Sequence, residues 1–168
     1  MSVQYCDRWF YAGKRPIDVL DEETARARHE ARLPYTAVLG SFDGPTHVIS
    51  VASPWVSVGF FDSSRREYLN YDFKETDTEP TSLLLSRVEF REFAGDSDEP
   101  LTHTQLAFEP NGRLLIERQD VRTGETLERE TRDDLAENWE DYPTFGSYES
   151  LCRAERLPAV RRVANDRT

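Results

Sequence analysis

The sequence lacks any apolar run of about 18 residues, the length that a helix needs to cross a bilayer. Its N-terminus also lacks the basic and then apolar layout of a secretory signal peptide. Only two cysteines occur, Cys6 and Cys152, whereas a secreted protein commonly has a denser set. These absences predict a cytoplasmic protein with two reduced thiols; a disulfide between the two cysteines is the alternative.

Positive charge is scarce. The 21 Lys and Arg residues are outnumbered by 32 Asp and Glu residues, which gives a net charge of -11. Nucleic-acid phosphates and anionic lipids repel such a chain, so we expect neither nucleic acid nor a membrane as a partner. A basic protein is the better expectation. Lys14 and Lys74 are the two lysines, and the preference for arginine is typical of a GC-rich genome.

Motifs for catalysis or cofactor binding are also missing. The glycines form no phosphate-binding cluster, and no Cys-x-x-Cys or His-Glu-x-x-His pattern occurs. His29 is expected to face solvent, whereas His47 and His103 lie on expected strands and could meet, although structural or surface roles are favoured. The acidic loop 96–99 lacks the glycine and the distant glutamate of a calcium loop. We therefore expect no cofactor and favour a non-enzyme, with a dispersed acid–base site as the alternative.

Aromatic residues are plentiful, with nine Phe, seven Tyr and three Trp. Large rings bury much area each, so they can organise a core that has few aliphatic side chains. At 168 residues the chain is long enough for one domain with a real core. We expect a single domain over residues 1–157 and a frayed tail over residues 158–168.

Alternation of apolar and polar residues predicts an antiparallel sheet. The clearest case is Glu67–Lys74, where Leu69, Tyr71 and Phe73 share one face. Six other stretches read as strands: Val3–Ala12, Tyr35–Phe42, Thr46–Ala52, Trp55–Phe61, Ser82–Phe93 as a strand running to an edge, and a meander from Leu101 to about Thr131.

Two helices are expected. Pro16 suits a first helical turn, and apolar or small residues then follow at steps of three and four, which predicts a helix over Ile17–Arg32. A short helix capped by Asp133 or Asp134 should place Leu135 and Trp139 on its inner face, and residues 142–151 should then cover the sheet. The fold class is therefore α+β, with a strongly curved, mainly antiparallel sheet; whether it closes into a barrel is left open.

Acidic residues concentrate over 72–79, 96–99 and 125–141, and in the last run they interleave with aromatic side chains. A solvated, solubilising surface explains each run alone. A protein-binding surface, however, needs rigid aromatic anchors inside a charged rim that speeds encounter with an opposite charge. The candidate partner-binding residues are Asp134, Glu137, Trp139, Glu140, Asp141 and Tyr142.

The meander EPNGRLLIERQDVRTGETLERE, followed by ENWEDYPTFGSYESL, resembles the C-terminal part of small cytoplasmic immunity proteins from bacterial polymorphic-toxin systems. The resemblance covers about a third of the chain and carries no functional residue over by motif. It implies a non-enzymatic role in which an acidic domain binds a toxin domain, often a basic nuclease, and blocks its active site.

Two alternatives belong to other classes. A calycin-like β-barrel could enclose a small-molecule ligand, although the expected Gly-x-Trp opening is absent. A DNA mimic would need a regular double row of acids, which interleaved arginines such as Arg118 and Arg129 interrupt. The favoured function is sequestration or neutralisation of a basic protein partner.

Overall fold

The computed structural model describes residues 2–77, 82–154 and 156. The predicted tail over 158–168 and the end of the first acidic run lie outside these residues. Within them, no helix is long and apolar enough to cross a membrane.

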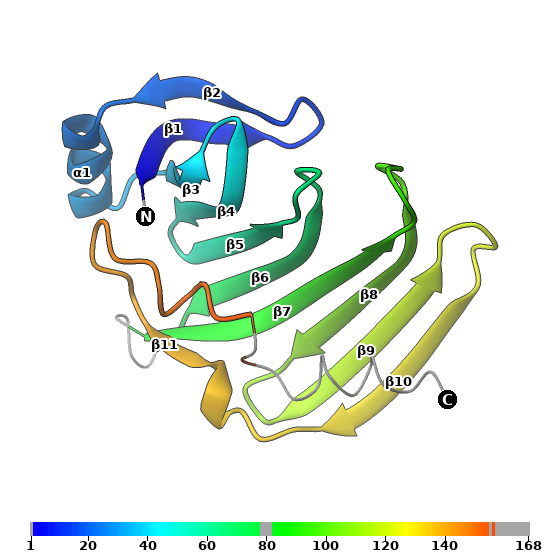
Figure 1. Ribbon diagram of the computed structural model, residues 1–168. Helices are drawn as coiled ribbons and strands as arrows, with labels where there is room; N and C mark the ends of the chain where they lie inside the picture. Colours follow the sequence, from blue (N-terminus) through cyan, green and yellow to red (C-terminus); the bar gives the residue numbers. More distant parts are fainter. Residues whose placement is uncertain (1, 78–81, 155, 157–168) are drawn as a thin grey trace.

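The described residues form eleven strands, one α-helix and one short 3-10 helix (Figure 1). The first half contains β1 (Val3–Phe10), β2 (Arg15–Leu20), α1 (Glu22–Glu30), β3 (Tyr35–Ser41), β4 (Gly44–Ala52) and β5 (Trp55–Phe61). The second half contains β6 (Glu67–Glu75), β7 (Ser82–Phe93), β8 (Pro100–Phe108), β9 (Arg113–Asp120), β10 (Thr126–Arg132), η1 (Ala136–Asn138) and β11 (Trp139–Asp141).

All strands belong to one antiparallel sheet with the order β10-β9-β8-β7-β6-β5-β4-β3-β1-β2. Strand β7 has three neighbours, because β11 pairs with its first residues and β8 with its later ones, while β6 pairs along its other side. The predicted antiparallel sheet and its α+β class are thus confirmed. The expectation that the β7 segment runs to an edge is wrong, because β7 lies in the middle of the sheet.

The sheet is strongly curved but not closed. Bulges, which bend a strand and increase its twist, interrupt the register at four places: Leu39/Gly40, Phe60/Phe61, Asp72/Phe73 and Glu92/Phe93. The path ends at β10 and β2, which do not pair with each other in the described part of the chain. Closure into a barrel, which the sequence left open, is therefore excluded.

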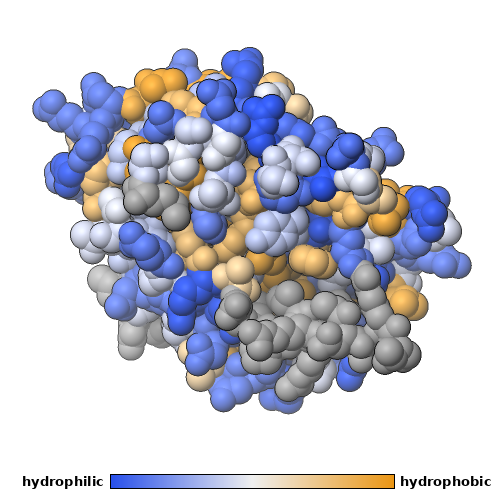
Figure 2. Space-filling model, in the orientation of Figure 1, coloured by the Kyte–Doolittle hydropathy of each residue, from blue (hydrophilic) through white to orange (hydrophobic). Residues whose placement is uncertain are grey.

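The main core lies on one face of this sheet. Alternate residues of the central strands, such as Val58, Tyr71 and Val88, are fully buried there. Helix α1 and residues 142–151 cover this face, and Tyr148 and Leu151 join the core. Figure 2, in the same orientation, shows apolar residues gathered toward the centre within a hydrophilic rim.

The predicted helix over Ile17–Arg32 is wrong in its first part. Residues 15–20 form β2, whose Ile17 lies opposite Arg8 of β1. The helix starts only after Asp21, whose carboxylate accepts a hydrogen bond from the Thr24 N–H at 2.7 Å. Pairing with β1 therefore outweighs the helical spacing, and Pro16, which cannot donate to a ladder, is tolerated because β2 is an edge strand.

Helix α1 and the turn that follows it hold the C-terminal cover through basic side chains. The guanidinium of Arg26 lies 4.5 Å from the centre of the Phe145 ring, and that of Arg32 lies 3.8 Å from the centre of the Tyr142 ring. His29 is half-buried between them, and its Nδ1 lies 3.0 Å from the Tyr35 hydroxyl. The expectation that His29 faces solvent is wrong.

Acidification should weaken this contact. Burial, together with the nearby Arg32 charge, lowers the pKa of His29 below its ordinary value, and burial does the same to the pKa of His47. The unfolded chain, with histidine pKa values near 6.5, therefore binds protons first. The contribution of these two histidines to the free energy of unfolding is therefore fully present above about pH 6.5 and is lost as the pH falls below that value.

We expect the free energy of unfolding, measured with urea from about pH 7.5 to pH 5.5, to stay nearly level down to about pH 6.5 and to fall below that value, in a range where most carboxylates hardly titrate. His29→Gln should reduce this slope, and the combination with His47→Gln should reduce it further. An unchanged slope in the double variant would contradict the assignment.

Candidate functional site

The predicted partner-binding residues lie on and around β11, a three-residue strand fixed to β7. Trp139 lies opposite Leu84 and Asp141 opposite Ser82 in the ladder. Just before the strand, the buried Asn138 side chain donates a hydrogen bond to the Leu85 carbonyl at 3.1 Å. The segment is therefore fixed to the sheet by backbone pairing and by a side-chain hydrogen bond.

The side chains of this segment separate into two groups. Asp134, Glu137, Trp139 and Asp141 are exposed, with 42% of Trp139 accessible. This corrects the expectation that Trp139 lies on the inner face of a helix: η1 ends before it, and alternation along β11 turns its ring outward. The four exposed residues form what we call the β11 surface.

Glu140 and Tyr142 belong to the second group, because they are engaged within the chain. Glu140 forms ion pairs with Arg153 and Arg156, each at 2.5 Å. Burial raises the pKa of Glu140, but hydrogen bonds from the two guanidiniums outweigh it and hold the pKa below its usual range. Tyr142 is half-buried beneath Arg32.

A second region, on the sheet face opposite the main core, is a hollow of about 720 Å³. Its floor consists of polar residues: Ser50, Ser57, Asn70, Glu89 and Arg91 alternate with core residues along the strands, and Glu67 lies opposite Phe61, beyond a bulge. We call this hollow the polar basin. A small apolar cluster containing Trp9 and Val48 lies on the same face and borders it through Phe61.

A charged network lies at the centre of this floor. Arg91 donates to Glu67 and to Glu89, each at 2.6 Å, and the Asn70 amide donates to Glu67 at 3.1 Å. Burial raises the pKa of Glu67, with the Arg91 charge opposing it, whereas the His103 imidazole, whose Nε2 lies 3.5 Å from the Glu89 carboxylate, and the nearby Arg91 charge lower the pKa of Glu89. Two neighbouring carboxyls thus differ in proton affinity.

Gly59 makes room for this network. A side-chain carbon built at Gly59 would lie only 2.4 Å from the Glu67 carboxylate. The Glu67 carboxylate therefore lies directly over the backbone of β5 at Gly59, where a larger residue would collide with it. A glycine inside a strand often marks such a close approach, and this is the signal by which the sequence could have located the basin.

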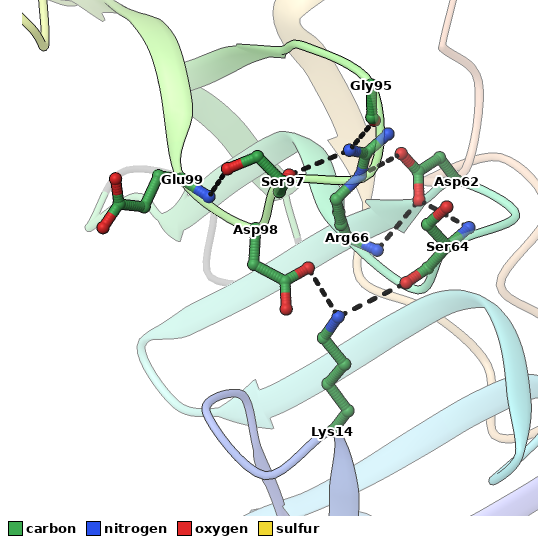
Figure 3. A network of polar contacts seen from close by, with 8 residues as sticks. All are labelled: Lys14, Asp62, Ser64, Arg66, Gly95, Ser97, Asp98 and Glu99. Atoms are coloured by element: carbon green, nitrogen blue, oxygen red, sulfur yellow. Dashed lines mark hydrogen bonds and ion pairs between the residues drawn. The ribbon is translucent and has the colours of Figure 1, made fainter.

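Three turns join at the rim of the basin (Figure 3). Lys14, from the β1–β2 turn, contacts Asp98 at 2.7 Å and the Ser64 carbonyl at 3.3 Å. Arg66 bonds to the carbonyls of Gly95 and Ser97 at 2.7 and 2.9 Å. Residues far apart in the sequence thus fix the shape of the opening.

Other candidate groups remain apart. His47 on β4 and His103 on β8 are separated by three strands, so they do not share a site. Cys6 and Cys152 are free thiols, which overturns the alternative of a disulfide between them. Among the described residues, no three His, Cys, Asp or Glu side chains are grouped for a metal ion.

Comparison with known proteins assigns no family. No family model, curated protein or solved structure matches this chain.

Proposed function

We propose that the chain is a non-enzymatic acidic protein that sequesters or neutralises a basic protein partner in the cytoplasm, as do the immunity proteins that its C-terminal part resembles. The observation that carries this proposal is Trp139, a large exposed ring on a strand that is hydrogen-bonded into the sheet. An anchor held in place before binding loses little conformational freedom in the complex.

The surrounding charges support the same function. Asp134, Glu137 and Asp141 leave their carboxylates exposed around the ring, whereas the Glu140 carboxylate is already paired. Exposed rim charges mainly accelerate encounter, and an aromatic anchor mainly slows dissociation. With a net charge of -11, the whole chain attracts basic partners over long range.

The two contributions can be separated by mutation. Asp134→Lys combined with Asp141→Lys should lower the association rate about tenfold at low salt. Trp139→Ala should weaken binding by about 2 kcal/mol, mainly through faster dissociation. The partner is first captured from lysate with the tagged wild-type chain and eluted with increasing salt. Binding kinetics are then measured with the purified partner.

A matched control is available in the β7–β8 turn, where Asp96→Lys combined with Glu99→Lys makes the same charge change away from the β11 surface. These substitutions should slow association much less. If Trp139→Ala bound the captured partner as tightly as the wild type, the β11 surface would not be the binding site. If no basic protein were captured, the function itself would be wrong.

A further inference from the structure

We propose that the polar basin binds a small, uncharged, hydroxyl-rich molecule of the monosaccharide or disaccharide class. This site is independent of the β11 surface, and it lies on the sheet face opposite the main core. Its volume of about 720 Å³ falls within the range of small-molecule sites, which is roughly 300–1,000 Å³.

The floor offers donors and acceptors side by side in fixed positions. The Glu67 carboxylate, whose side chain is only 14% exposed, accepts, while Arg91 donates and the Asn70 amide can do both. Adjacent hydroxyl groups of a sugar, each both donor and acceptor, match such a carboxylate–guanidinium–amide set. The hydrogen bonds among the three side chains hold them in place before a ligand arrives, which lowers the entropy cost of binding.

Tyr11 supplies an apolar wall. The residue is 43% exposed, and its ring stacks on Phe61, another lining residue, with the ring centres 6.3 Å apart. Burial nevertheless raises the pKa of the Tyr11 hydroxyl, which interacts with Ser50. The ring therefore stands at the edge of the basin with its polar end inside. This arrangement suits the C–H face of a sugar ring, which packs on the electron-rich face of an aromatic ring.

The charges of the lining favour an uncharged ligand. The cationic residues are Lys14, Arg65, Arg66 and Arg91, and the anionic residues are Glu67, Glu89 and Asp98. The basin thus departs from the strongly acidic character of the whole chain. Lys14, Arg66 and Arg91 are engaged in ion pairs within the protein. To engage Lys14, Arg66 or Arg91, an ionic ligand would have to disrupt these pairs, whereas hydroxyl groups can add to their remaining hydrogen-bonding positions.

The test is a titration of the full-length 15N-labelled chain, followed through its amide resonances. The probes are glucose, N-acetylglucosamine, maltose and cellobiose, each at up to about 10 mM, which is ten times a dissociation constant of about 1 mM. We expect at least one probe to produce saturable shifts at Tyr11, Ser57 and Asn70. Absence of saturable shifts with all four probes, or shifts confined to residues outside the basin, would overturn the proposal.

Two variants control for folding. Tyr11→Ala changes an exposed turn residue and should keep the wild-type spectrum while weakening binding at least tenfold. Asn70→Ala should have a similar effect on affinity. Arg113→Ala, a matched change on the outlying β9, should leave affinity unchanged. Unchanged affinity in both basin variants would refute the site, and a tenfold preference for glucosamine or glucuronate over glucose would refute the uncharged ligand.

Discussion

Replacement of Tyr148 by alanine is expected to lower the free energy of unfolding by about 4 kcal/mol. The Tyr148 side chain is fully buried in the main core, although it comes from the irregular segment that covers the sheet. Removal of the Tyr148 ring leaves a cavity. It also removes the hydrogen bond between the hydroxyls of Tyr148 and Tyr35, whose oxygens are 3.0 Å apart. The measurement is urea unfolding at pH 7.5, followed by aromatic fluorescence and circular dichroism.

Tyr148→Phe separates packing from hydrogen bonding. Tyr35 keeps His29 as a partner, so loss of the Tyr148 hydroxyl should cost only about 1 kcal/mol. If the alanine variant were as stable as the phenylalanine variant, the cover would contribute little to the fold. The stability of the core would then come from the strands and not from the segment that covers them.

The second large effect is expected at Arg156. Its side chain is completely buried, with its guanidinium 5.3 Å from the centre of the Phe73 ring. It donates to the Glu140 carboxylate and, at 2.6 Å, to the Ser150 carbonyl. Arg156→Ala should cost about 3 kcal/mol, because it leaves part of the Glu140 charge and a carbonyl without their partner.

Arg153 is the matched control, since it binds the same Glu140 carboxylate from an exposed position. Arg153→Ala should cost less than about 1 kcal/mol, as is usual for exposed ion pairs. Arg156→Leu combined with Glu140→Leu should be more stable than Arg156→Leu alone, because the charge that is then left without its partner, on Arg153, is exposed to solvent rather than buried. Equal losses for the two alanine variants in urea unfolding would contradict the buried role of Arg156.

The strands could be predicted from the sequence because the alternation of apolar and polar residues has a direct physical cause. In β6, Leu69, Tyr71 and Phe73 are buried, whereas Asn70 and Asp72 between them are only partly buried and lie on the other face, and this is the period-two pattern of a strand with two different faces. The predicted strands Tyr35–Phe42 and Thr46–Ala52 correspond to β3 and β4, which pair as an antiparallel hairpin. Gly40 permits its bulge, with a φ of 97°.

The errors lie where long-range contacts decide the structure. Residues 15–20 become a strand because β1 provides an edge, which local spacing does not reveal. Trp139 faces outward because three residues of β11 pair with β7, so a sheet contact replaces the expected helix. In both places tertiary pairing outweighs a weak local preference.

The two candidate regions differ in how far sequence could locate them. The β11 surface is contiguous in the chain, so composition alone indicated it, although composition could not show that Glu140 is paired internally. The polar basin joins residues from Tyr11 to Asp98, and its outward-facing polar residues look like an ordinary solvated face. Only the turn contacts of Lys14 and Arg66 show that this face is enclosed by a rim.

The two edge strands of the open sheet influence whether the protein self-associates at high concentration. An unprotected edge strand is a template on which a second chain can add and start aggregation. At one end, Pro16 lacks an N–H and Asp18 has a φ of 48°, so β2 offers an irregular ladder. At the other end, β10 carries charges of alternating sign at Glu128, Arg129, Glu130 and Arg132. Both edges therefore discourage templated addition, and a sheet that never closes can still resist self-association.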